Sequence, residues 1–316
     1  MLDSKHSGNI ASVTSSIEDS VLISALLMVL GSTCFAGMAA LVKTASNEAT
    51  ATQAVLYRAV FSALPLWIVM RLRSAKVRGT RWKLLLFRGV LGFLALYCYL
   101  WSVAHIPFAN VLALQQMNPV FVAFLAVWLL GERPQRFHYA VAAVCMVGAL
   151  LVVRPTRGFA SLGSAVALLS AVLSSIAYVA VRSLTQTETT QRIVLWFSAV
   201  AAVLALPLAI PTWQPLSVRA HTLLIGAGFM ALAAQSLMTA SYRRAQAHVA
   251  SAFSYSAVPI GYVAGIVLWG ERPDWVSTLG ISLIVVGGTV IAARVRPTAR
   301  AQRLPRQEPG HQRRDS

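Results

Sequence analysis

Two prolines lie near the middle of two long apolar segments, and polar side chains precede both of them. Pro119 follows Gln115 and Asn118, and Pro259 follows Tyr255. A proline inside a helix leaves the carbonyl four residues earlier without its hydrogen bond. Within a membrane, such a carbonyl is tolerated where it meets protein or a water-filled cavity. The pattern is compatible with a packing kink, but we expect these residues to line a polar cavity.

Other polar and aromatic side chains interrupt neighbouring apolar segments. Tyr99, Tyr178 and Gln235 each stand among Ala, Leu and Val residues. Such a mixture suits a pocket that has apolar walls and a few hydrogen-bonding groups. We therefore add these three residues to the candidate cavity, although ordinary helix packing is an open alternative for each of them.

Two arginines lie inside apolar segments, and two glutamates end such segments. Arg58 and Arg88 can extend their side chains to the membrane surface, contact an anion, or act as gates. Glu132 and Glu271 can serve as positioning groups or pair with these arginines, as Glu132–Arg88 on one side and Glu271–Arg58 on the other. None of the ten Asp and Glu residues lies at the centre of a segment, so no carboxylate relay for protons is expected there.

The sequence holds none of the motifs that would indicate catalysis. We find no His-Glu-x-x-His, no phosphate-binding glycine loop and no nucleophilic serine elbow. The three cysteines fit neither a zinc site nor a disulfide framework. We expect no enzyme activity, no cofactor and no metal.

The elements that carry these residues are long apolar helices. Hydrophobic residues make up 57% of the 316 residues and charged residues only 12%, which excludes an ordinary soluble protein. A membrane helix needs about 20 mostly apolar residues. Ten segments qualify, approximately 21–42, 54–71, 84–104, 107–130, 137–153, 163–181, 193–211, 221–241, 247–269 and 275–293.

The basic residues predict how the chain is oriented. Of the 27 Lys and Arg residues, 20 fall in loops and tails on the side of both termini and five on the other side. The positive-inside rule then places both termini in the cytoplasm of a multi-pass protein of the cell membrane, in bacteria the inner membrane. The net charge of +17 is spread over these short loops, so we expect contacts with lipid headgroups and not with nucleic acid.

The two halves of the chain repeat each other. Gly131-Glu132-Arg133-Pro134 recurs as Gly270-Glu271-Arg272-Pro273, and Gly92-Phe93-x-Ala95-Leu96 recurs as Gly228-Phe229-x-Ala231-Leu232. Pro119 corresponds to Pro259 at a similar offset. Each repeat holds five segments, and because five is odd, the second copy enters the membrane from the opposite side. Inverted repeats of this kind build many secondary transporters.

A central proline followed by Gly-Glu in each five-segment half resembles the EamA-type branch of the drug/metabolite transporter superfamily. The resemblance covers about residues 21–293 and is strongest from Arg88 to Pro134. It implies an all-α membrane protein of ten helices, with a central cavity lined by the first, third and fourth helices of each half. The expected organisation is a cytoplasmic tail at 1–20, repeats at 21–153 and 163–293, and a basic cytoplasmic tail at 294–316.

The function expected from these features is secondary transport of a small organic metabolite, similar to an amino acid, nucleoside or vitamin. Alternating access would move it through the cavity between the repeats, as a monomer or homodimer. The alternative is an integral membrane enzyme or an accessory scaffold. An enzyme predicts ionisable residues clustered at one membrane surface, whereas a transporter predicts a polar cavity near the midplane.

Overall fold

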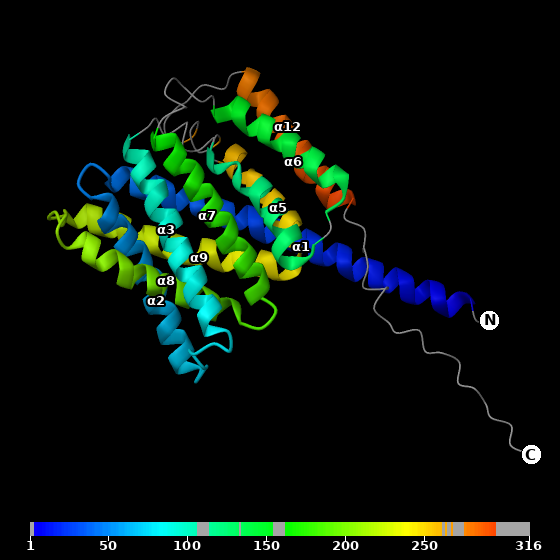
Figure 1. Cartoon of the computed structure of the whole chain (residues 1–316), viewed down its shortest axis with the longest axis horizontal. Helices are drawn as coiled ribbons and strands as arrows, with labels where there is room; N and C mark the ends of the chain where they lie inside the picture. Colours follow the sequence, from blue (N-terminus) through cyan, green and yellow to red (C-terminus); the bar gives the residue numbers. More distant parts are fainter. Residues whose placement is uncertain are drawn as a thin grey trace, which may run out of the picture.

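The computed structural model describes residues 3–105, 114–132, 134–153, 162–260, 263, 267 and 275–294. Within these ranges the chain is helical, with short connections and no strand. The helices are α1 (Asp3–Ala45), α2 (Ala51–Leu72), α3 (Trp82–His105), α5 (Asn118–Leu130), α6 (Arg136–Val153), α7 (Leu162–Leu184), α8 (Thr190–Ala209), α9 (Val218–Arg244), α10 (Ala247–Ala252) and α12 (Trp275–Arg294), with a 3-10 turn, η1, at Phe253–Ser256. Figure 1 shows their arrangement.

Helix α1 begins much earlier than the sequence predicted. The apolar segment predicted at 21–42 is the second part of a longer helix, which runs without interruption from Asp3 to Ala45. Its first turns project away from the other helices (Figure 1). Hydropathy marks only where the apolar part begins, whereas a helix continues until a residue breaks it, and this stretch contains no proline.

Six helical segments are long and apolar enough to cross a membrane. They are Ser20–Val42 within α1, α2, Trp82–Tyr99 within α3, α7, α8 and α9. The fourth, fifth and tenth expected segments hold the shorter apolar helices Asn118–Leu130, Arg136–Gly148 and Thr278–Gly287. The ninth holds α10, η1 and the short helical stretch after them. The described residues thus show a multi-pass helical protein with six full-length spans, and the count of ten stays a prediction.

Corresponding helices of the two repeats run antiparallel. Near the start of α2, Thr52 Oγ1 lies 2.7 Å from Thr212 Oγ1, just beyond the end of α8. Near the start of α8, Arg192 Nε donates to the Lys76 carbonyl beyond the end of α2 at 3.0 Å. Helices α6 and α12 are paired in the same sense, because Gly148 faces Gly280. This is the geometry of a two-fold axis between the repeats.

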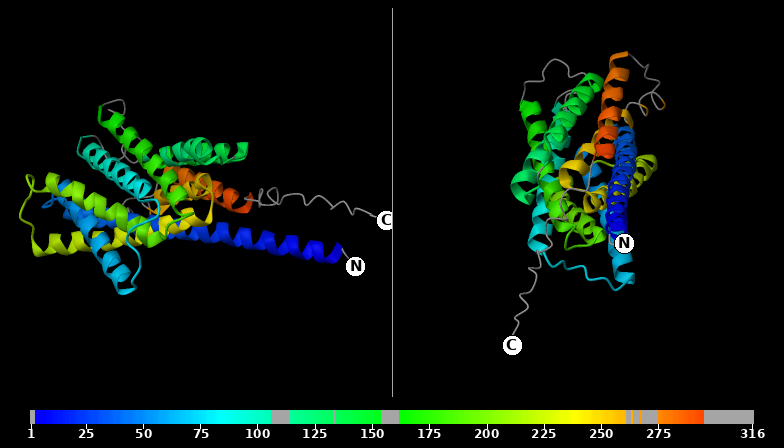
Figure 2. Two further views of the ribbon diagram at one scale, coloured as in Figure 1. Left: turned by 60° about the horizontal axis from the view of Figure 1, so that its bottom comes forward. Right: turned by 90° about the vertical axis from the view of Figure 1, so that its right-hand side faces the viewer.

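Contacts between the halves also come in matched pairs. Helix α1 packs along α9, and α7 packs along α3 (Figure 2). Likewise α2 packs on α9, and α3 packs on α8. The buried positions of α7 and α9 are mostly small residues, among them Ala167, Ala171, Ala227 and Ala231. Small residues let helix backbones approach closely, which is how membrane helices associate without a hydrophobic driving force.

One glutamate after the first helix of each repeat links that repeat to the other. Glu48 Oε2 accepts from the Ser217 N–H, where α9 begins, at 3.0 Å. Glu188 Oε1 accepts from the Arg81 N–H, where α3 begins, at 2.8 Å. Each carboxylate therefore caps the third helix of the opposite repeat, at the positive end of its dipole. Glu48 and Glu188 therefore have the same role in the two repeats.

Candidate functional site

Two arginines from different helices meet at one aromatic ring in the middle of the bundle. The Arg88 guanidinium on α3 lies 4.0 Å from the ring centroid of Phe197 on α8. The Arg58 guanidinium on α2 lies 5.9 Å from the same centroid. Arg88 is only 2% exposed, whereas Arg58 is half-buried. The expectation that both side chains simply extend to the membrane surfaces does not describe this arrangement.

A glycine makes room for Arg88. A Cβ atom added at Gly92, one helical turn after Arg88, would stand 2.5 Å from Arg88 Nη1 and 2.7 Å from Phe197 Cε2. Those distances are too short for any side chain. The sequence repeat had matched Gly92 with Gly228, and Gly228 lies equally close to Phe61 on α2. Both glycines thus allow the third helix of one repeat to approach the second helix of the other.

Arg58 and Phe197 line a small pocket of about 10 Å³ between the repeats. Its walls come from α2, α3, α8 and α9, and they are Val55, Arg58, Ala59, Ser62, Leu96, Phe197, Ser198, Ala201 and Gln235. A wider pocket of about 160 Å³ adjoins it, sharing Val55 and including Phe93, Tyr97 and Trp101. It lies where α2 begins and where α3 and α8 end, so the small pocket is approached from that end of the bundle.

Few protein groups compensate the charge of Arg88. Its Nη2 donates to Gln235 Oε1 at 3.3 Å, while Nε and Nη1 find no hydrogen-bond partner among the described residues. An arginine at the centre of a membrane helix costs about 2.5–3.5 kcal/mol on insertion scales. A cation–π contact returns roughly 0.5–2 kcal/mol. The contact with Phe197 therefore does not offset the cost of burying this cation.

Two of the tyrosines in the predicted cavity lie close to this pair of arginines. Tyr99 on α3 interacts electrostatically with Arg58. Tyr178 on α7 interacts with both arginines, and its ring packs 5.8 Å from that of Tyr242. With Gln235, three of the predicted cavity residues therefore gather around the arginines.

The two predicted cavity residues before Pro119 form hydrogen bonds with a neighbouring helix. Gln115 Nε2 donates to Ser170 Oγ at 2.8 Å, and Asn118 Nδ2 donates to the Ala171 carbonyl at 3.2 Å. The Asn118 carbonyl in turn accepts from Ser175 Oγ at 3.2 Å. These bonds join the segment to α7, so both amide side chains are engaged by protein in this conformation.

Neither proline lies in the middle of a continuous helix. The chain turns at Gln116 and Met117, and α5 begins at Asn118, which places Pro119 in its first turn. Pro259 follows the 3-10 turn Phe253–Ser256 in the same way. A proline needs no hydrogen-bonded N–H in the first turn of a helix, so the packing kink that the sequence left open as an alternative is not formed. Both repeats thus carry a discontinuous fourth helix.

Tyr255 belongs to another part of the bundle. It is 1% exposed and packs with Cys145 and Ile284, between α6 and α12. Its hydroxyl has no hydrogen-bond partner among the described residues. The structure therefore separates Tyr255 from the pocket that holds the arginines.

Glu132 pairs with residues other than the predicted Arg88. Its Oε1 accepts from the Ala247 N–H at 2.8 Å, and its Oε2 lies 2.8 Å from His248 Nδ1, with Arg182 Nε at 3.8 Å from Oε1. Burial by itself would raise the pKa of Glu132, but the bonds from His248 and Ala247 hold it below its usual value. Arg88 instead faces Gln235, so the Glu132–Arg88 gate is not formed. Glu271 lies outside the described residues.

The Gly-Glu pair has a clear local role. Gly131 ends α5 with a φ of 64°, a left-handed conformation that favours glycine. The turn directs Glu132 to the first N–H groups of α10, which has no side-chain cap of its own. Sequence reasoning found the motif but had no means of finding the helix end that it caps.

Phe197 is the site residue that the sequence analysis missed. Two N-cap threonines, Thr50 for α2 and Thr189 for α8, show that Arg58 and Phe197 occupy the same position in the two repeats. The two repeats therefore place a cation and an aromatic ring at equivalent positions, facing each other across the two-fold axis. Alignment of the repeats on these threonines is the signal that could have revealed the pair.

Comparison with known proteins agrees with this architecture. The model of the EamA-like transporter family matches the chain twice, at residues 22–154 and 161–293. The pseudopaline exporter CntI of Pseudomonas aeruginosa is 35% identical over 266 residues, covering 83% of this chain and 93% of that protein. A riboflavin transporter of Rhizobium johnstonii is 27% identical over 226 residues, covering 70% and 72%.

A solved crystal structure shares the fold. It superposes with a TM-score of 0.73 at 19% identity, covering 87% of this chain and 98% of the other. The duplicated family match coincides with the antiparallel pairing of corresponding helices around the arginines. The chain belongs to the EamA-like transporter family.

Proposed function

We propose that this membrane transporter carries a small organic metabolite by alternating access between its two repeats. The observation that supports the proposal most directly is the pocket lined by Arg58, Phe197 and Gln235, where helices of both repeats meet. Related proteins are named as exporters or transporters of pseudopaline and riboflavin, so small metabolites are the class to test.

The discontinuous helices support the alternating mechanism. Helix α5 and the helical stretch that follows η1 each begin beside a proline, in equivalent positions of the two repeats. Discontinuous helices at a repeat interface commonly form transporter binding sites and absorb the movement of one half against the other. On this proposal Gln115 and Asn118 exchange their bonds with α7 for bonds with substrate when the pocket opens.

The proposed topology has ten spans in two inverted repeats, at 21–153 and 163–293, with both termini in the cytoplasm. The wide pocket beside Val55 then opens toward the outer face. Labelling cysteines introduced at positions 47 and 76 with an impermeant reagent tests this topology. We expect labelling from outside at position 47 and from inside at position 76, and the reverse pattern would contradict it.

We propose facilitated or exchange transport without a dedicated proton relay. The described carboxylates Glu48, Glu132 and Glu188 all cap helix ends and do not line the pocket. Transport that requires a proton gradient would show that another titrating group drives it.

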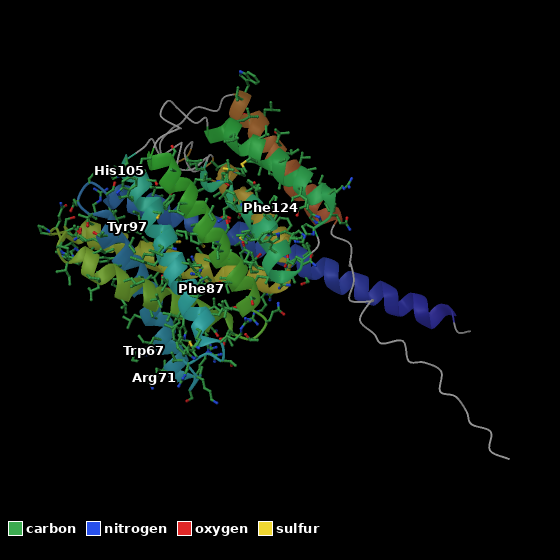
Figure 3. All side chains as sticks on the ribbon, in the orientation of Figure 1. Trp67, Arg71, Phe87, Tyr97, His105 and Phe124 are labelled. Atoms are coloured by element: carbon green, nitrogen blue, oxygen red, sulfur yellow. The ribbon has the colours of Figure 1, made fainter. Side chains whose placement is uncertain are left out.

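Reconstitution of the full chain tests the proposed function. Proteoliposomes loaded with one unlabelled compound are given the same compound in labelled form, using amino acids, nucleosides and vitamins including riboflavin. We expect counterflow of at least one compound, and we expect it to fall in Gln235→Ala, whose amide lines the pocket. Arg71→Gln, at the exposed end of α2 in Figure 3, is the matched control. No counterflow of any compound would contradict the proposal.

A further inference from the structure

The chemistry around Arg88 points to the class of substrate, and this inference rests on the proposed function. We propose that Arg88 and Arg58 bind an anionic group of the substrate, a carboxylate or a phosphate, beside Phe197, where Arg88 adjoins the pocket that Arg58 lines. The transported metabolite is then an organic anion, and the two guanidinium groups determine its selection.

The first argument is the set of unused donors. Arg88 is 2% exposed, and its Nε and Nη1 atoms have no hydrogen-bond partner in the described ranges. A buried polar group without a partner is rare in native proteins and calls for an explanation such as an absent ion. An oxyanion supplies the acceptors that two free guanidinium donors require, and charge-assisted bonds of this kind are the strongest that arginine makes.

The second argument is the balance of charge. Arg58 and Arg88 converge on one aromatic ring, at 5.9 and 4.0 Å. The acids whose side chains are described, Glu48, Glu132 and Glu188, are bonded at helix ends instead. Two buried cations repel each other in a medium of low dielectric constant. A bound anion would therefore relieve both the repulsion and the missing hydrogen bonds.

The third argument is the composition of the adjoining pocket. Gly92 lets Arg88 Nη1 and the Phe197 ring pack against the backbone of α3, beside this pocket. Ser62 and Ser198 line the pocket and can hydrogen-bond a ligand, although the Ser62 hydroxyl donates to the Gly228 carbonyl at 3.0 Å. Val55 and Leu96 add apolar surface. The pocket holds about 10 Å³ in this conformation, so an organic anion enters when the helices around it move apart.

Thermal unfolding of the purified full-length protein in detergent tests the inference without knowledge of the natural substrate. The probes are the sodium salts of phenylacetate and succinate and glucose 6-phosphate, each compared at equal ionic strength with phenylacetamide, succinamide or glucose. A ligand that binds only the folded protein raises its unfolding temperature. We expect at least one anion to raise it more than its neutral counterpart does. Protection by a carboxylate alone or by the phosphate alone identifies which anionic group the site takes.

Variants test whether the anions bind at these two arginines. Arg88→Gln and Arg58→Gln should each weaken the apparent affinity about 10- to 100-fold, the range expected for loss of a hydrogen bond to a charged group. Arg88→Lys, which keeps the charge, should retain part of the affinity that Arg88→Gln loses. Arg71→Gln removes an exposed arginine that stacks on Trp67 at 5.5 Å, so it controls for total charge and for loss of a cation–π contact.

The outcomes separate this inference from the proposed function. Equal protection by anions and neutral counterparts, no protection by any anion, or full protection in Arg88→Gln would overturn the inference. If counterflow is then observed for a neutral compound, the protein is a transporter and only the anionic substrate class is wrong. If anions bind through Arg88 but no compound shows counterflow, the anion site stands and the proposed transport is wrong.

Discussion

The charged residues at the ends of the helices have partners, whereas those in the middle of the bundle do not. At one end, Glu132 binds His248, Arg182 and the first N–H of α10, and at another, Glu188 binds Arg192 and the start of α3. In the middle, Arg88 has one long bond to a neutral amide and an aromatic ring.

This difference separates the charges that stabilise the fold from those that are free to bind a ligand. A buried charge with complete partners becomes costly only when a partner is removed. A buried charge without partners is costly already, so the fold tolerates it at a functional site. The five predictions below test this distinction, from the largest expected effect to the smallest.

Removing a partner at the helix ends should have the largest effect. Glu132→Ala leaves His248 and Arg182 without their acid and α10 without its cap. Breaking a buried ion pair costs about 3–5 kcal/mol, and we expect the low end because Glu132 is 9% exposed. Chemical denaturation of the detergent-solubilised protein measures the loss. Glu132→Gln, which can still accept from the Ala247 N–H, should lose less, and an equal loss would show that the cap is unimportant.

Filling the space beside Arg88 should have the next largest effect. Gly92→Ala places a methyl group 2.5 Å from Arg88 Nη1, so the guanidinium or Phe197 must move. Overpacking of this kind costs about 1–3 kcal/mol. Gly226→Ala in α9 is the matched control, because its added Cβ would lie 3.4 Å from the nearest atom, Leu41 Cδ1. Counterflow should fall in Gly92→Ala alone, and equal behaviour of the two variants would argue against a reserved space.

The sequence was sufficient to predict the repeated helices but not the contacts between them. Segment positions, the two-fold repeat and Gly92 with Gly228 all follow from local patterns, because apolar length and repeated motifs are properties of adjacent residues. The meeting of Arg58, Arg88 and Phe197 depends on how three helices cross, which hydropathy does not encode. The same limit misassigned the partner of Glu132, since the helix that donates an N–H to it lies 115 residues away.

The prolines show a second limit of prediction from sequence. Their position was correct, but whether a proline kinks a helix or starts one depends on the bonds made by the preceding residues. Here Asn118 and Ser175 bond the chain to α7, and these bonds favour a break before Pro119. Tyr255 was misplaced for the same reason, because the break turns it toward α6 and α12.

Lowering the pH should destabilise the ion-paired helix ends before it affects the arginines in the middle of the bundle. Burial alone would raise the pKa of Glu188, but bonds from the Arg81 N–H and Arg192 lower it below the usual value. A lowered pKa in the folded state gives stability that is present above the unfolded pKa of about 4.3 and is lost as the pH falls through the folded value. The part of the unfolding temperature that depends on Glu188, measured as wild type minus Glu188→Gln, should therefore be constant from about pH 7 to 5 and should fall below about pH 4.3.

Glu188→Gln is the control for this pH profile. Its profile should be flatter than that of the wild type below about pH 4.3, although Glu48 and Glu132, whose pKa values are also lowered, still contribute. The groups that face Glu188 are Arg192 and Arg243, which keep their charge over this range. Identical profiles for variant and wild type would assign the acid sensitivity to other carboxylates.

A smaller difference should appear between the N-caps of the two repeats. Thr50 caps α2 in a reciprocal box with Gln53, whereas Thr189 caps α8 with Arg192 at the corresponding position, which offers no acceptor to the cap. Thr50→Ala should cost about 1 kcal/mol, and Thr189→Ala less. Denaturation of both variants measures the difference, and a larger loss in Thr189→Ala would show that the box is not decisive.

The smallest change in stability should come from removing the central charge. Arg88→Gln deletes a cation that has one hydrogen bond at 3.3 Å and two donors without partners, so little favourable interaction is lost. The cation–π contact contributes roughly 0.5–2 kcal/mol, which is less than the cost of about 2.5–3.5 kcal/mol for burying the cation. Without ligand, the free energy of unfolding should change by less than about 1 kcal/mol or rise. Arg182→Gln, which removes a partner of Glu132, should lower it clearly under the same conditions. A loss in Arg88→Gln as large as that in Arg182→Gln would mean that Arg88 is held by interactions of the fold itself, and the distinction between the helix ends and the centre would fail.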